Sequence, residues 1–301
     1  MDLPVTTPML IEHNTKVLHL ESTDVCQAAC PLCPRETNVN FDKNHQHHLS
    51  FDQIVKVFDI EQIKMLNKMF MCGNYGDPAA GAHTLDIYQQ FKKLNPQITL
   101  GMNTNGAIQN TTWWHELSKI MNQPTDYVIF SIDGLEDTNH IYRKNVSWSK
   151  LMKNVSSFIQ AGGSAHWDML VYQHNEHQIE ECENLARKMG FKWFRAKVSK
   201  RRLVQGLQYP SKLTPITQLD HTYIDCHAVK EKSVYIDARG RLHPCCWLGS
   251  NLDNHLTLAD VAATWRTESP DSTCKKICSS ASPNSDVKTI FSSQWRIEKQ
   301  L

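Results

Sequence analysis

The sequence predicts an α/β fold in which a parallel β-sheet forms the core. Apolar, β-leaning segments alternate with segments of helical periodicity along the first two thirds of the chain. Parallel strands need crossover connections, so this alternation is typical of repeated βα units. The chain has 301 residues and is 41% hydrophobic, which is enough to bury a large core. We therefore expect an open doubly wound sheet or an incomplete barrel, with its chemistry at the carboxyl ends of the strands.

The expected strands and helices follow one another in βα order. Ser50 is a candidate N-cap at the start of one helix, and Gly162-Gly163 and Gly190 are candidate helix ends. None of the turns from strand to helix contains GxGxxG, so the dinucleotide-binding fingerprint is absent. The strands are expected at 17–22, 68–72, 98–103, 127–132, 165–171 and 193–198. The helices are expected at 50–66, 84–94, 111–121, 147–161 and 175–189.

The character of the sequence changes after residue 200. Pro210, Pro215 and weak periodicity indicate a linker, after which residues 234–236 and 241–243 flank a turn that is typical of a β-hairpin. A region this small, with little apolar periodicity, needs a staple such as a bound metal. The expected division of the chain is an N-terminal extension (1–15), a core (16–200), a linker (201–224) and a small cysteine-rich α+β unit (225–301).

Charge and hydropathy exclude several classes of protein. There are 32 Lys and Arg residues against 31 Asp and Glu residues, so the basic surplus of a nucleic-acid-binding protein is missing. No stretch reaches the ~18 consecutive apolar residues of a membrane span. The first residues have neither the basic start nor the apolar stretch of a signal peptide. We expect a cytoplasmic protein with neither a nucleic acid nor a membrane as its partner.

Eight of the ten cysteines are clustered toward the two ends of the chain, and only Cys72 and Cys182 lie between the clusters. A chain without a secretion signal favours metal or redox ligands over disulfides. The first cluster is Cys26-x3-Cys30-x2-Cys33, directly after the first strand. Three thiolates on one loop can occupy three corners of an iron–sulfur cube. On a helix the same spacing would form a buried stripe, but Pro31 and Pro34 oppose a helix there.

Two further alternatives remain open for the first cluster. Cys30-x-x-Cys33 alone is compatible with a dithiol redox motif or with half of a zinc site. The zinc site would need further ligands, for which His45, His47 and His48 are the nearby candidates. These histidines stand in a polar loop, which favours simple exposure to solvent.

The Cx3Cx2C spacing after the first strand of a βα-repeat chain resembles the radical S-adenosylmethionine (radical SAM) enzymes. The resemblance implies that Cys26, Cys30 and Cys33 hold a 4Fe–4S cluster with one open iron, which the amino and carboxylate groups of SAM chelate. An electron from the cluster then splits the sulfonium into methionine and a 5′-deoxyadenosyl radical. An electron donor such as a flavodoxin or ferredoxin is implied as a partner. Leu32 stands where the family usually has an aromatic residue, and is expected to pack against adenine.

The resemblance continues at the ends of the next three strands. The segment from Cys72 to Pro78 is similar to the family's Gly-Gly-Glu-Pro turn, which binds the methionine ammonium. A Thr-Asn-Gly-like segment begins at Asn103, and Ser131-Ile132-Asp133-Gly134 precedes an arginine suited to the methionine carboxylate. Each turn alone is common, and it is their succession that is specific. The implied SAM contacts are Leu32, Gly76, Asp77, Asn103, Ser131, Asp133 and Arg143.

The second cysteine cluster lies in the C-terminal unit. Four thiolates fill the coordination of either zinc or an iron–sulfur cube, and the residues alone leave both open. The Gly240-x4-Cys245 hairpin resembles the SPASM and twitch domains, which bind auxiliary 4Fe–4S clusters. The resemblance thus implies a partial (β/α)6 TIM-like barrel followed by a twitch-like domain with a β-hairpin. The implied ligands are Cys226, Cys245, Cys274 and Cys278, with Cys246 as a buried neighbour.

The expected function is that of a radical SAM enzyme with two 4Fe–4S clusters, one of which binds SAM. The radical would abstract hydrogen from a substrate, either in peptide or protein modification or in small-alcohol dehydrogenation. The auxiliary cluster would accept the electron left on the substrate. The alternative is a non-catalytic zinc or iron–sulfur binding module on a degenerate barrel. The sequence names no general base.

Overall fold

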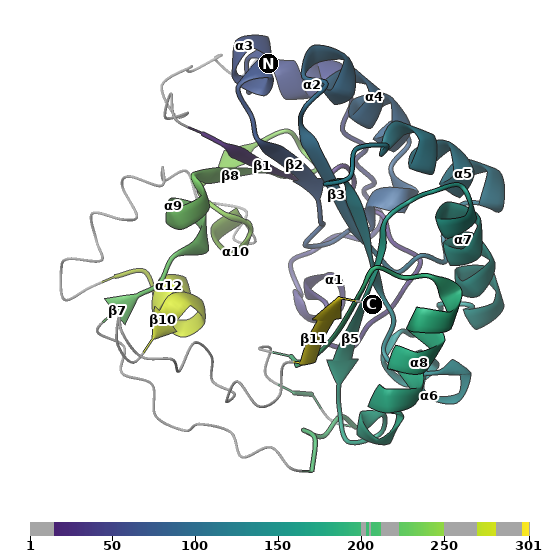
Figure 1. Cartoon of the computed structure of the whole chain (residues 1–301). Helices are drawn as coiled ribbons and strands as arrows, with labels where there is room; N and C mark the ends of the chain where they lie inside the picture. The colour runs from purple at the N-terminus through teal and green to yellow at the C-terminus, as the bar shows by residue number, and fades with distance from the viewer. Residues whose placement is uncertain are drawn as a thin grey trace.

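The computed structural model describes residues 15–199, 203–204, 206–211, 223–249, 270–280 and 297–300. One nine-stranded sheet dominates it, in the order β11-β6-β5-β4-β3-β2-β1-β8-β9 (Figure 1). Strands β8 and β1 to β6 are parallel, whereas β9 and β11 are antiparallel to their neighbours at the two edges. Because the two edge strands do not pair within the described residues, the barrel is partial.

The six predicted strands are confirmed in chain order, with small shifts at their ends. Side chains alternate between the two faces of each strand, and Leu18 and Leu20 of the first are fully buried. Each of the first five strands is followed by at least one helix before the next strand, as the βα pattern predicts. The strands are β1 (Val17–Leu20), β2 (Lys68–Met71), β3 (Thr99–Thr104), β4 (Tyr127–Ser131), β5 (Ala165–Val171) and β6 (Trp193–Val198).

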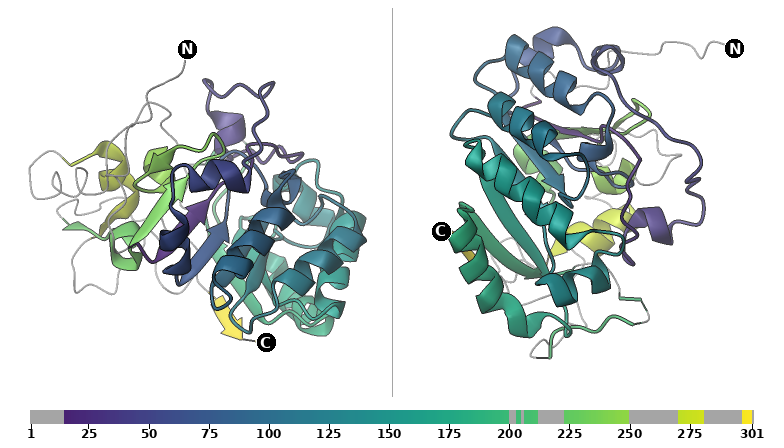
Figure 2. Two further views of the ribbon diagram at one scale, coloured as in Figure 1. Left: turned by 90° about the horizontal axis from the view of Figure 1, so that it is seen from above. Right: turned by 90° about the vertical axis from the view of Figure 1, so that its right-hand side faces the viewer.

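The major crossover helices cover one face of the sheet, where α4, α5, α7 and α8 succeed one another (Figure 2). Trp114 and Phe158 pack there against Phe130 of the sheet. The helices are α1 (Pro34–Thr37), α2 (Phe51–Val55), α3 (Ile60–Lys64), α4 (Thr84–Leu94), α5 (Thr111–Ile120), α6 (Glu136–Tyr142), α7 (Trp148–Gln160) and α8 (Ile179–Met189), with 3-10 turns η2 (Pro78–Ala80) and η3 (Glu176–Gln178).

The local signals predicted from the sequence are confirmed at several helix ends. The Ser50 side chain accepts a hydrogen bond from the Gln53 N–H in a capping box, and Gly190 ends α8 with φ +90°. The helix expected at 50–66 is instead two short helices, α2 and α3. Asp59 interrupts it, because its side chain caps α3 by accepting from the Glu61 N–H.

The C-terminal hairpin joins the main sheet. Its first strand, β8 (Ser233–Ile236), pairs in parallel with β1 and sets Tyr235 opposite His19. The antiparallel β9 (Leu242–His243) completes the predicted hairpin. The short elements that precede and follow the hairpin in the chain lie on the side of the sheet away from α4, α5 and α7 (Figure 1). They are β7 (Tyr223–Ile224), α9 (His227–Glu231), α10 (Cys246–Gly249), α12 (Ser272–Cys278) and β10 (Ser279–Ser280), with β11 (Ile297–Gln300) beside β6.

The predicted domain boundaries stay a prediction. Residues 1–14 of the expected N-terminal extension lie outside the described residues, and so does most of the expected linker. Within the described part of the chain, no helix is both long and apolar enough to cross a membrane.

Candidate functional site

The N-terminal cysteine loop runs from Asp24 to Cys33 above the carboxyl ends of β1 and its neighbours, and it is not helical. The alternative of a buried helical stripe is therefore excluded. The Cys26 sulfur accepts a hydrogen bond from Nδ2 of Asn105, which follows β3, over 3.7 Å. The Cys33 thiol donates to the carbonyl oxygen of Asn74, which follows β2, over 3.8 Å. Two thiols of one loop thus contact the turns after two different strands.

Cys30 contacts a third turn, through Arg143 at the end of α6. Its sulfur lies 3.8 Å from Nη1 of Arg143, while Nε of the same guanidinium is 2.6 Å from Oδ2 of Asp133. Asp133 is fully buried, and its Oδ1 accepts the Leu170 N–H over 2.6 Å. Burial alone would lower the pKa of Arg143, but Asp133 together with Cys30, Tyr142 and Tyr172 raises it above its usual value, so the cation persists. These contacts give Asp133 the role of positioning Arg143, and its direct contact with SAM stays a prediction.

The turn after β2 is packed against the cysteine loop so closely that its glycines have no room for a side chain. A Cβ at Gly76 would stand 1.9 Å from the Thr23 carbonyl oxygen, and one at Gly73 would stand 2.3 Å from the Gly76 oxygen. The Asp77 N–H donates to the Val25 carbonyl over 2.9 Å. The Gly-x-x-Gly-Asp-Pro pattern therefore encodes a close backbone approach.

Asp77 is tied to the end of β3. Its two carboxylate oxygens accept from the N–H of Ala79, the hydroxyl of Thr104, and both the N–H and Nδ2 of Asn105, at 2.7 to 3.0 Å. Burial raises its pKa above the usual value, against these hydrogen bonds. A carboxylate offers about four acceptor positions, and four donors occupy them here. The predicted contact with the methionine ammonium stays a prediction, while the geometry assigns Asp77 to holding two turns together.

The remaining predicted SAM contacts differ in how deeply their side chains are buried. Leu32 is buried in the main core, with 3% of its surface exposed. Asn103 and Ser131 are half-buried near the carboxyl ends of β3 and β4. Asn105 is the residue that the predicted contacts miss, although it bonds both Cys26 and Asp77. The feature that could have identified Asn105 in the sequence is its position as a polar side chain directly after a strand.

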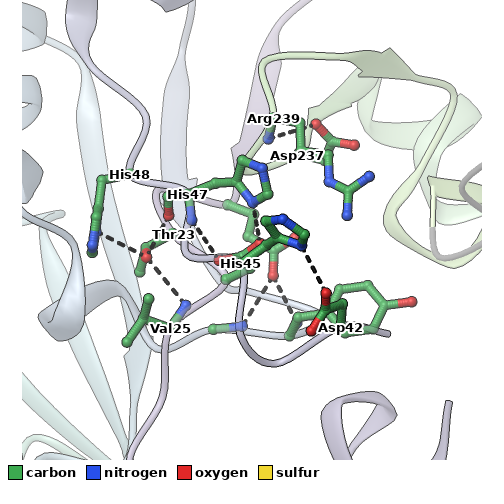
Figure 3. A network of polar contacts seen from close by, with 12 residues as sticks. Thr23, Val25, Asp42, His45, His47, His48, Asp237 and Arg239 are labelled. Carbon is green, nitrogen blue, oxygen red and sulfur yellow. Dashed lines mark hydrogen bonds and ion pairs between the residues drawn. The ribbon is translucent and has the colours of Figure 1, made fainter. Parts of the chain in front are cut away.

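Two of the three loop histidines make hydrogen bonds with residues at the start of the cysteine loop instead of pointing into solvent. Nδ1 of His47 is 2.7 Å from Oδ2 of the buried Asp24, and Nδ1 of His48 is 3.1 Å from the Thr23 hydroxyl (Figure 3). His45 pairs only with the exposed Asp42. Throughout the described ranges, no three His, Cys, Asp or Glu side chains converge on a position for a single metal ion. These histidines therefore complete no zinc site with Cys30 and Cys33 here.

The C-terminal cysteines gather around α10 and α12. Cys274 and Leu248 form a small core against which Cys245 packs. Burial raises the pKa of Cys245 to about 11, and the nearby Cys226 and Cys274 thiols add to that rise. Cys278 stands one helical turn after Cys274 on α12, and its carbonyl accepts the Asp225 N–H over 2.7 Å.

The adjacent Cys246 has different neighbours. Burial raises its pKa, and besides Cys245 the charges that act on it are those of Cys72 and Glu21 in the main sheet. Cys245 therefore belongs with the other C-terminal cysteines, whereas Cys246 turns toward the sheet. The ligand set itself stays a prediction.

A sequence profile described as the Radical SAM superfamily matches residues 20–189. The chain belongs to the radical SAM superfamily. Membership implies an enzyme that binds SAM at a 4Fe–4S cluster. The matched range begins at the last residue of β1 and ends with α8, so it contains all of the site built on the strand ends.

Solved structures agree with this fold. SuiB of Streptococcus suis has 13% sequence identity and a TM-score of 0.60, over 86% of this chain and 67% of that chain. Its form bound to S-adenosylmethionine has a TM-score of 0.61 at the same identity and coverage. At this identity the likeness shows the fold alone, and this chain spans about two thirds of the length of SuiB. No curated protein matches the sequence significantly.

The radical SAM cysteines fit a 4Fe–4S cluster by their chemistry. All three first-cluster donors are sulfur, they lie on one non-helical loop, and burial and the charges of Cys30 and Cys33 raise the pKa of Cys26. Iron supplies the positive charge that such crowded thiolates need. A cube presents a separate iron atom to each cysteine, so its ligands stand further apart than those of one ion.

Proposed function

We propose that this chain cleaves SAM reductively and uses the product to abstract hydrogen from a substrate at the carboxyl ends of the strands. When bound, the 4Fe–4S cluster supplies the electron that splits SAM into methionine and the 5′-deoxyadenosyl radical. The observation that carries the proposal is the placement of Cys26, Cys30 and Cys33 on one loop. Each thiol contacts a different turn, so the loop is centred over the strand ends.

Arg143 supplies the fixed positive charge of this site. Its guanidinium stands beside the Cys30 sulfur, held by the fully buried Asp133. An arginine that is already oriented loses little further entropy when it pairs with a carboxylate. We assign it to the methionine carboxylate of SAM.

The glycine turn supplies backbone polar groups for the methionine ammonium. Gly76 lets the turn approach the cysteine loop, and Asp77 locks it to Asn105 and Thr104. Asn103 and Ser131 lie nearby at the ends of β3 and β4, where they are assigned to the ribose. The chain thus holds both charged groups at the α-carbon of the methionine moiety, with residues that follow β2 and α6.

The C-terminal cysteines are assigned to an auxiliary 4Fe–4S cluster. Cys226, Cys245 and Cys274 lie close together, and Cys278 follows on the same helix as Cys274. A fully ligated cluster would take up the electron left on the substrate. The substrate of the enzyme is a peptide or a small alcohol. The electron that reduces the SAM-binding cluster comes from a flavodoxin or ferredoxin. SuiB, which has been solved with its precursor peptide SuiA, motivates the peptide assignment.

The test is the content of iron, acid-labile sulfide and zinc per chain after anaerobic reconstitution, together with 5′-deoxyadenosine formed under reduction. About eight irons, about eight sulfides and turnover of SAM are expected for two cubes. About four irons with one zinc would keep the radical enzyme but remove its auxiliary cluster. Zinc without sulfide would overturn the proposal in favour of a non-catalytic binding module.

A further inference from the structure

A buried carboxylate with no part in the proposed chemistry lies directly after β1. Glu21 is 2% exposed. Its Oε1 accepts the N–H groups of Tyr75, over 2.7 Å, and of Gly76, over 3.1 Å, both in the glycine turn. Its Oε2 accepts the hydroxyl of Tyr235, which comes from β8. One side chain therefore connects the N-terminal strand, the turn assigned to SAM and the C-terminal hairpin.

A second contact joins the same three parts. Nδ2 of Asn74, in the turn, donates to the Cys246 carbonyl over 2.7 Å and to the Tyr235 hydroxyl over 3.4 Å. The backbone carbonyl of Asn74 is the group that accepts from the Cys33 thiol. Asn74 thus touches the cysteine loop on one side and the C-terminal segment on the other.

These hydrogen bonds decide which groups the turn can offer to a ligand. Glu21 occupies the N–H groups of two consecutive residues, and Asp77 is filled by donors from β3. An ammonium only donates hydrogen bonds, so the groups of the turn that can meet it are acceptors, chiefly its backbone carbonyl oxygens. Their direction depends on the orientation of the peptide planes, and Glu21 sets that orientation.

Tyr235 completes this arrangement from the C-terminal side. A buried carboxylate is costly unless its oxygens are hydrogen-bonded, and Tyr235 supplies the donor for Oε2. His19, stacked on Phe70 at 4.3 Å, lies against the Tyr235 ring at 4.8 Å and limits its movement. The phenol is therefore held in place by β1 and its neighbours.

We propose that Tyr235 and Glu21 are positioning residues for SAM, so that the C-terminal hairpin forms part of the SAM site. Tyr235 orients Glu21, and Glu21 with Asn74 sets the turn that meets the methionine ammonium. This inference rests on the proposed function, because it assumes that the turn binds SAM. The inference goes beyond the proposed function because it makes the affinity for SAM depend on Tyr235, a residue outside the matched range 20–189.

The test uses the full-length reconstituted chain and its Tyr235→Phe variant. The readouts are the dissociation constant of SAM and the change that SAM causes in the electron paramagnetic resonance spectrum of the reduced cluster. Loss of one supporting hydrogen bond weakens binding up to about tenfold. We expect that weakening, with a smaller spectral change on SAM addition and unchanged iron content. Glu21→Gln retains a carbonyl for the turn and an amide for Tyr235, so it should bind SAM better than Glu21→Ala.

Tyr88→Phe is the matched control. It also removes a buried phenol hydrogen bond, but one that Tyr88 of α4 donates to the Gly101 carbonyl of β3, at 2.7 Å, and not to a residue that contacts Glu21. Wild-type affinity in Tyr235→Phe would overturn the inference, and so would equal weakening in both variants. A wild-type chain that holds iron and sulfide but binds no SAM would overturn the proposed function first, before any variant is compared.

Discussion

The two cysteine regions differ in what holds them in place. Cys26, Cys30 and Cys33 contact turns that the parallel sheet supports, and the sheet packs into one large core. The C-terminal cysteines lie among short elements whose own core contains only Leu248 and Cys274 among the described buried residues. The first site is organised by the fold before any metal arrives. With the proposed auxiliary cluster bound, the second would depend on that cluster for stability, as small metal-stapled units do.

The largest expected effect separates the two sites by substitution. Cys30→Ser should abolish 5′-deoxyadenosine formation and remove about four irons, because one cube loses a ligand. Cys274→Ser should also remove about four irons while SAM cleavage without substrate continues. Iron analysis and chromatography of 5′-deoxyadenosine measure both. If Cys274→Ser also abolished SAM cleavage, the two sites would not be separable in this way.

Metal removal should reveal the difference in stability. After anaerobic chelation, amide hydrogen exchange in α10 and α12 should rise at least about a hundredfold, equal to about 2.7 kcal/mol of local stability. Exchange in β3 and β4 should stay slow, because strand pairing and a large apolar core hold them in place without a metal. Equal loss of protection in both regions would contradict the comparison.

The charge pair behind Cys30 contributes to the stability of the first site. Asp133→Asn leaves Arg143, with 15% of its side chain exposed, without its carboxylate partner. Breaking a buried pair in this way costs about 3 to 5 kcal/mol of unfolding free energy. Denaturant unfolding measures the loss. Glu61→Gln breaks the exposed pair with Lys64 and should change the free energy by about 0.5 kcal/mol or less.

Glu21, between the two regions, makes stability depend on pH. Burial raises its pKa from 4.5 to about 7, with hydrogen bonds from Tyr235, Tyr75 and Gly76 opposing the rise and the charge of Asp237 adding to it. Cys246 also faces it from the C-terminal segment. The folded chain thus binds a proton more tightly than the unfolded one. Between pH 4.5 and about 7, stability should fall by about 3 kcal/mol as pH rises.

The control for this pH dependence is Glu21→Gln, which cannot titrate. The unfolding free energy of the wild-type chain minus that of Glu21→Gln should fall by about 3 kcal/mol as pH rises from 4.5 to 7, measured by denaturant titration at each pH. A difference that does not change with pH would show that Glu21 has an ordinary pKa in the folded chain.

Local signals predicted much of the fold. The alternation of strands and helices predicts the order β1 to β6, and Ser50 and Gly190 mark helix ends correctly. The break in the expected helix at Asp59 was not predicted, because helical periodicity continues across it. The parallel pairing of β8 with β1 could not be predicted, since the hairpin residues specify their own turn but not the distant strand they join.

The sequence predicted which residues belong to the site better than it predicted the contacts between them. The spacing of Cys26, Cys30 and Cys33 and the turn around Gly76 are visible in the sequence. The partners of Asp77 and Asp133 are not, because the donors come from β3, β5 and α6. A carboxylate that looks available to a ligand in the sequence is therefore already occupied in the fold.

The pairing of β1 with β8 also orders events during synthesis. β1 is made early, and its hydrogen-bonding edge on the β8 side has no partner until residues 233–236 leave the ribosome. An open strand edge is a template for pairing with another chain. The nascent chain therefore carries this exposed edge while the residues between β1 and β8 are made, and a cellular chaperone that shields it would act on β1 until the hairpin arrives.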